Sequence, residues 1–147
     1  MQVNGKTTIK APRDKVWAAL TDMDFVAACA PGLENMEVVE TDRKFRATGS
    51  VGLGNLKVSF TGEIEFTALE APDRAVLKGR GTAPGSAVEG TAEMRLSDDP
   101  EGGTLLDWTA DINVLGTIAS LASRMMGSVT QKLTAEFFGC VKQRIES

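Results

Sequence analysis

The side chains in this sequence that could do chemistry are mostly carboxylates, and two residue types that enzymes commonly use are missing. The 147 residues include no histidine and no tyrosine. Without histidine, a serine or cysteine nucleophile lacks its usual base, and without tyrosine a common proton donor for ring-closure chemistry is missing. Catalysis of the triad type is therefore excluded.

Two cysteines, Cys29 and Cys140, are the remaining candidates for metal ligands or redox groups. Zinc and iron sites need clustered cysteine, histidine or carboxylate ligands, and neither cysteine has a close companion in the sequence. We therefore expect no metal. We expect a cytoplasmic protein, where thiols stay reduced, so free thiols are favoured over a disulfide.

The carboxylates are sorted onto one side of the predicted strands. Over residues 55–66 an apolar phase alternates with a polar phase that carries Glu63. Residues 87–96 and 104–114 are sorted in the same way, with Asp107 on the polar phase. Side chains alternate between the two faces of a sheet, so only the apolar phase can face the interior. The predicted interior therefore lacks acid–base groups, and an enzyme would need a stray acid such as Glu34, which we interpret as a solvated turn residue.

The spacing of apolar and turn residues predicts an α+β fold. A strand over residues 3–9 is followed by two short helices, one after Pro12 and one ending near Cys29. Six further strands between residues 34 and 114 have short connections, which indicates an antiparallel sheet. An i, i+4 apolar row predicts a helix over residues 117–146, about 45 Å long. We expect all 147 residues to form one domain, a curved seven-stranded antiparallel sheet wrapped around this long C-terminal helix.

An apolar interior is either a packed core or a core with a vacancy for an apolar ligand. Small residues at inward positions favour the vacancy; they are Ala47, Gly49, Gly62, Gly90, Ala92 and Ala110. We expect a ligand to contact larger apolar residues and one alanine, namely Phe60, Phe66, Met94, Trp108, Ala110, Met125, Val129, Leu133 and Phe137. The mouth of the cavity is expected near Pro31 and Gly32.

Composition argues against two classes of partner. The net charge is −4 and no run of Lys or Arg could neutralise a phosphate backbone, so no nucleic-acid partner is expected. No apolar stretch approaches the about 20 residues that a transmembrane helix needs. These observations favour a cytoplasmic protein that binds a small molecule.

The predicted order of elements resembles the helix-grip fold of START and Bet v 1-like proteins, the SRPBCC superfamily. Four segments look like the G-subunit family of carbon monoxide dehydrogenase: residues 11–17, 28–32, 60–62 and 102–106. The Cys-x-Pro-Gly turn that begins at Cys29 is the most particular of these features. The resemblance implies a non-enzymatic accessory protein of a molybdenum-containing hydroxylase that binds a quinone or lipid-like molecule, with no covalently bound cofactor.

Two alternatives stay open at this point. The protein could be an assembly or membrane-recruitment factor for that hydroxylase with no ligand, or a polyketide cyclase-like enzyme of the same fold. The resemblance implies peripheral contact with the inner face of the membrane, but we expect no evident anchor in this chain.

Overall fold

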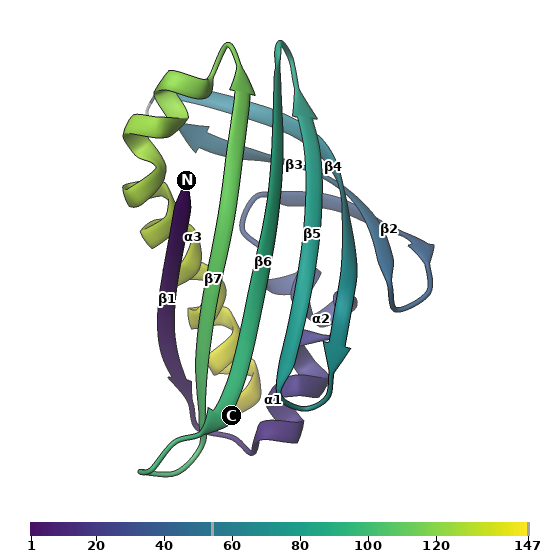
Figure 1. The fold of residues 1–147 in the computed structure, drawn as a ribbon, viewed down its shortest axis with the longest axis vertical. Coiled ribbons are helices and arrows are strands. Elements are labelled where there is room, and N and C mark those ends of the chain that lie inside the picture. Colours follow the sequence, from purple (N-terminus) through teal and green to yellow (C-terminus); the bar gives the residue numbers. More distant parts are fainter. Residues whose placement is uncertain (54, 147) are drawn as a thin grey trace.

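The computed structural model describes residues 1–53 and 55–146, and in this part of the chain the sequence forms seven strands and three helices (Figure 1). The helices are α1 (Arg13–Leu20), α2 (Met23–Cys29) and α3 (Ala119–Glu146). The strands are β1 (Gln2–Ile9), β2 (Leu33–Glu40), β3 (Lys44–Leu53), β4 (Leu56–Glu70), β5 (Arg74–Ala83), β6 (Ser86–Asp98) and β7 (Thr104–Gly116).

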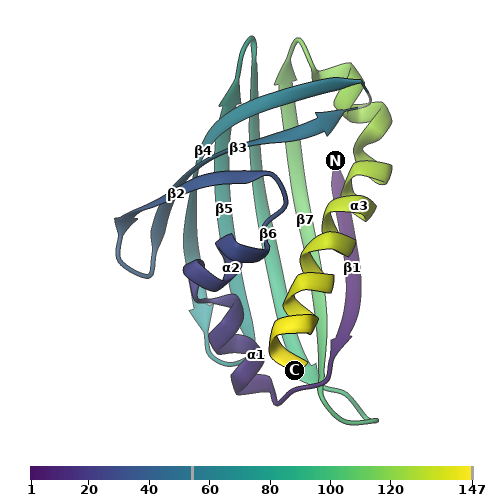
Figure 2. The same ribbon diagram turned by 180° about the vertical axis from the view of Figure 1, so that it is seen from behind.

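All seven strands form one antiparallel sheet in the order β1-β7-β6-β5-β4-β3-β2. Figure 1 shows that the sheet is strongly curved, with β2 and β3 running across the direction of β5, β6 and β7. Figure 2, the view from behind, shows α3 crossing the concave side of the sheet diagonally, beside α1 and α2. The helix-grip fold predicted from the sequence is confirmed.

Local sequence explains where the two short helices begin and end. Pro12 occupies the N-cap position of α1, where its fixed φ suits the start of a helix. The Asp22 side chain caps α2 by accepting a hydrogen bond from the Asp24 backbone N–H at 3.0 Å. After Cys29, Gly32 turns the chain into β2 with a φ of 78°, a conformation that glycine adopts without strain.

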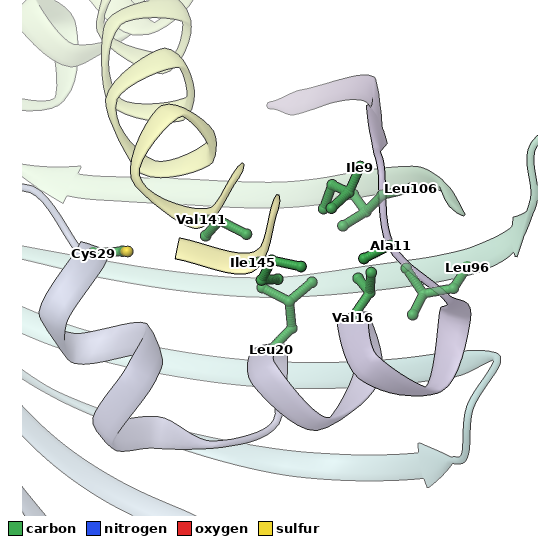
Figure 3. Close-up of a cluster of buried hydrophobic side chains, with 9 residues drawn as sticks. All are labelled: Ile9, Ala11, Val16, Leu20, Cys29, Leu96, Leu106, Val141 and Ile145. Atoms are coloured by element: carbon green, nitrogen blue, oxygen red, sulfur yellow. The ribbon is translucent and has the colours of Figure 1, made fainter. Parts of the chain in front are cut away.

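The main buried core lies around the C-terminal end of α3 (Figure 3). It joins α1, α2, the C-terminal end of α3 and neighbouring strands through Ile9, Ala11, Val16, Leu20, Cys29, Leu96, Leu106, Val141 and Ile145. In the N-terminal half of α3, Ala122 is the one described residue that is buried. The two ends of α3 are therefore packed differently, and the space beneath its N-terminal half is less filled.

The prediction of two free thiols is wrong, because Cys29 and Cys140 form a disulfide between α2 and α3. The two residues are 111 positions apart in sequence, but their Cα atoms are 5.5 Å apart, within the range that a disulfide spans. The prediction assumed a reducing compartment and had no means of placing Cys140 beside α2. None of the described helices has the length and apolar character that crossing a membrane requires.

Candidate apolar cavity

The middle of the concave face is built from residues with little or no side chain. The strand register pairs Gly62 with Gly81 and Gly79 with Gly90 across neighbouring strands. One row further along, Ala92 of β6 pairs with an alanine of β7. Alternation places these residues on the same face as the buried core. Small side chains therefore leave a hollow at the centre of the sheet.

The first part of the cavity lies between α3 and the ends of β4 to β7, and we call it the helix chamber. It has a volume of about 290 Å³. Its lining residues are Val51, Val58, Phe60, Thr82, Ala83, Ser86, Ala87, Val88, Val114, Ile118, Ala122, Met126, Val129 and Leu133. None of these is titratable, and no polar atom contributes to the exposed surface of the chamber.

The second part lies over the glycine-rich centre of the sheet, and we call it the sheet chamber. It has a volume of about 340 Å³, and its apolar lining residues are Ala47, Phe60, Gly62, Ile64, Leu77, Gly79, Gly81, Val88, Gly90, Ala92, Ala110 and Ile112. Phe60 and Val88 line both chambers, so the two chambers meet there. Charged residues such as Glu63 border the sheet chamber from positions that alternate with these glycines.

The ionisable groups with perturbed pKa values form ion pairs away from the helix chamber. A hydrogen bond from Arg46, at 3.1 Å, and the charge of Lys44 lower the pKa of Glu63. Hydrogen bonds from Arg95 and then Arg74 lower the pKa of Glu93. A lowered pKa keeps a carboxylate ionised, which is unsuited to a general acid at neutral pH. These groups are structural ion pairs on the outer sheet face.

Two further features of the described residues bear on metal binding and on buried polar groups. No cluster of cysteine, aspartate or glutamate in it could hold a metal ion. Every buried side-chain nitrogen and oxygen in the same residues has a hydrogen-bond partner. Glu34, the stray acid considered above, is exposed and lies in β2, not in a turn; Ser50 Oγ approaches its carboxylate at 3.5 Å.

Four of the predicted ligand contacts lie at the cavity wall. Phe60, Val129 and Leu133 line the helix chamber, and Ala110 lines the sheet chamber. Phe60 is the one of these four that contacts both parts of the cavity. Whether any of them binds a ligand stays a prediction.

Other predicted contacts are placed in packed regions. Phe66 is buried, with its ring centroid 6.4 Å from that of Phe45. Trp108 and Phe137 pack against the main core, and Met94 packs against both buried clusters. None of these four residues lines the helix chamber or the sheet chamber.

Met125 is not among the residues that line the helix chamber, and its neighbour Met126 is. The predicted row repeated every four residues, but each such step overshoots a full helical turn by about 40°. Toward the N-terminus of α3, away from the buried Ile145, this rotation accumulates. The residue that follows Val129 at the cavity wall is therefore Met126, three positions back, and then Ala122.

The predicted mouth at Pro31 and Gly32 is packed against β3. The Gly32 carbonyl accepts a hydrogen bond from the Ser50 backbone N–H at 2.9 Å. A Cβ atom added to Gly32 would lie 2.1 Å from the Ser50 carbonyl oxygen, so this turn is in close backbone contact. Neither residue lines the helix chamber or the sheet chamber.

The sequence reasoning missed Gly79 and Gly81, which complete the floor of the sheet chamber. A signal for them exists, because Ala75 and Leu77 continue into these glycines with period two. Glycine has no side chain and often marks a bend, so the alternation is easily overlooked where the two glycines continue it. Pairing with Gly62 and Gly90 shows that they belong to a regular strand.

Comparison with solved structures supports the fold over the whole chain. A conserved protein from Geobacillus kaustophilus is similar, with 25% identity, a TM-score of 0.91 and coverage of 99% of this chain and 95% of the other. The ZhuI aromatase/cyclase from Streptomyces sp. R1128 shares 22% identity, a TM-score of 0.72 and coverage of 99% and 93%. A protein from Thermus thermophilus shares 17% identity, a TM-score of 0.68 and coverage of 99% and 97%.

Curated proteins include no sequence that matches this chain. A family profile gives a clear assignment, because the profile of CoxG, the G-subunit of carbon monoxide dehydrogenase, matches residues 5–146. With that match spanning nearly the whole sequence, the chain belongs to the CoxG family.

Proposed function

We propose that this protein is a non-enzymatic carrier of an apolar small molecule, a quinone or another lipid-like compound. The observation that carries this proposal is the helix chamber, whose exposed surface includes no polar atom. Such a chamber can bind hydrocarbon without leaving a polar group of the protein unpaired. Together with the adjoining sheet chamber it falls within the usual size range of small-molecule sites, about 300–1,000 Å³.

Burial of apolar surface supplies the binding energy in this proposal. Each Å² of apolar surface removed from water contributes about 25 cal/mol, so a buried hydrocarbon chain gains several kcal/mol before entropic costs. Val129 and Leu133 on α3 and Val88 on β6 face the ligand from opposite sides of the chamber. No acid or base of the protein is required for this role.

The family assignment suggests the partner. We propose that the carrier serves a molybdenum-containing hydroxylase of the carbon monoxide dehydrogenase type and exchanges its ligand at the inner face of the membrane. The ligand then stays shielded from water between the membrane and the enzyme.

One observation favours a second candidate, an assembly or recruitment factor that acts through its surface. Strand β2 is an edge of the sheet, and the side chains of Val38 and Val39 on it are 62% and 46% exposed. Exposed apolar residues on a strand edge suit contact with another protein. A cyclase is less well supported, because the helix chamber contains no titratable residue.

Native mass spectrometry of the purified protein, followed by organic extraction, tests the carrier directly. A co-purifying quinone or lipid supports it, and Ala110→Asp, which puts a charge in the sheet chamber, should then abolish binding. If the folded Ala110→Asp variant binds as tightly as the wild type, Ala110 does not face the ligand. A ligand-free mass with no thermal shift on adding quinones would favour the recruitment factor.

A further inference from the structure

The two chambers meet at a junction that two side chains define. Phe60 projects from β4 and Val88 from β6, and both line the helix chamber and the sheet chamber. Strand β5 lies between them and contributes Ala83 to one chamber and Gly81 to the other. The junction is therefore a gap between a phenyl ring and a valine, with almost no side chain beneath it.

The strand spacing and register set the scale of this gap. Strands β4 and β6 are two spacings apart, about 9.6 Å between backbones, and Phe60 lies two residues along β4 from Gly62, which shares a row with Gly81 and Val88. The gap therefore runs diagonally across β5, and a hydrocarbon chain needs less room between the two side chains than a ring does. A side chain at Gly81 would close the gap, because its Cβ would lie 3.3 Å from Val88 Cγ1.

The Phe60 ring is held in place by the neighbouring strand. A Cβ at Gly49 of β3 would lie 3.1 Å from Phe60 Cζ, so the ring rests over a position without a side chain. Gly49 is itself buried beneath the turn at Gly32, whose carbonyl oxygen would lie 2.5 Å from the same Cβ. Backbone packing thus fixes one wall of the gap.

The surroundings of the two chambers give a direction to a chain that crosses the gap. No polar atom contributes to the exposed surface of the helix chamber, and the Ser86 hydroxyl in its lining already accepts from the Ile118 backbone N–H at 3.2 Å. The sheet chamber is the more open of the two to solvent. A polar end in the sheet chamber can therefore keep its contact with water.

Building on the proposed carrier function, we propose that the ligand is a single-chain amphiphile whose hydrocarbon end lies in the helix chamber. Its chain passes between Phe60 and Val88, and its polar end remains at the sheet chamber. The gap between these two residues determines which chain lengths bind tightly, because only a chain that crosses it can use both chambers.

The affinities of octanoate, dodecanoate and hexadecanoate for the wild type, measured by displacement of a fluorescent dye, test this proposal. Each buried methylene adds about fourfold in affinity, so hexadecanoate should exceed dodecanoate by on the order of a hundredfold. The Gly81→Val variant should bind hexadecanoate no more tightly than dodecanoate. Gly52→Val is the matched control, because a Cβ at this strand glycine meets no atom within 4 Å; it should behave as the wild type.

Two further measurements complete the test. Val88→Phe narrows the gap from β6 and replaces Gly81→Val in the test if that variant fails to fold. It too should bind hexadecanoate no more tightly than dodecanoate. Hexadecanedioate carries a second carboxylate at the end expected in the helix chamber, so it should bind the wild type at least about a hundredfold more weakly than hexadecanoate. Equal binding of the two would overturn the proposed orientation.

The outcomes separate this inference from the carrier function on which it rests. If the affinity of the wild type rises from dodecanoate to hexadecanoate and both folded variants show the same rise, the gap does not determine which chain lengths bind tightly. In that case the inference fails while the carrier function stands. If none of the three acids binds the wild type and native mass spectrometry finds no ligand, the carrier function fails and the inference fails with it.

Discussion

Opening the Cys29–Cys140 disulfide should lower the free energy of unfolding by about 3–4 kcal/mol, and the sequence separation sets this magnitude. A crosslink between residues 111 positions apart removes much of the entropy of the unfolded chain. Chain-entropy arguments give about 4.7 kcal/mol for a loop of 100 residues, and measured effects are typically about 2–4 kcal/mol. The thiols should stay packed after reduction, because Cys29 is only 6% exposed within the main core. The loss is therefore mainly entropic.

Urea denaturation of the oxidised protein and of the protein reduced with a phosphine measures the difference. The double variant Cys29→Ala, Cys140→Ala is the control: it should resemble the reduced wild type and be insensitive to reductant. Because the Cys29 sulfur is buried in the main core and Cys140 is partly buried, a reductant reaches the bond less easily in the folded protein, and reduction should be slower without denaturant than with it.

Two results would refute this reasoning. If thiol titration of the unreduced protein finds both cysteines free, the bond does not form. If the mass confirms the bond but reduction changes the free energy of unfolding by less than about 1 kcal/mol, the unfolded chain is already as compact as the crosslinked one.

Two more predictions concern the cavity and the outer face. Gly79→Leu should fill the sheet chamber and weaken ligand binding at least tenfold. It should not lower the melting temperature, because a Cβ at this position meets only the Glu63 carbonyl oxygen, at 3.7 Å. Calorimetry and dye displacement measure both effects, and the control Gly52→Leu should leave the affinity unchanged. The lowered pKa values of Glu63 and Glu93 mean that their stabilisation is present above the unfolded value of 4.5 and is lost as the pH falls through the folded pKa. Urea midpoints measured across that range should fall with acidification, and less so in Glu63→Gln; an equal fall would show that this carboxylate does not contribute.

The fold could be predicted from the sequence because its signals are local and repeated. Alternation over 55–66 covers most of β4, up to the irregularity in its pairing with β5 after Phe66, and the helical row before Ile145 extends through most of α3. Turn residues then leave short connections, which allow only antiparallel neighbours. Each of these signals would survive an error of one or two residues at an element boundary.

The details of the cavity depend on contacts that one strand's pattern does not contain. Gly81 becomes part of the cavity because register places it between Gly62 and Val88. Met126 replaces Met125 at the wall because a small rotation per turn accumulates along a long helix. The disulfide was missed for the same reason, since Cys140 meets Cys29 only where α3 packs beside α2.

The uneven distribution of the core explains how the chain can keep an apolar cavity and still fold. The helix chamber leaves about 290 Å³ unfilled, so the side chains that line it lack the neighbours they would have in a close-packed core. This lost packing costs stability. The close-packed core around Val16 and Val141 and the nearby disulfide stabilise the opposite end of α3. Because a ligand that fills the chamber offsets the remaining cost, ligand binding and stability should rise together in this protein.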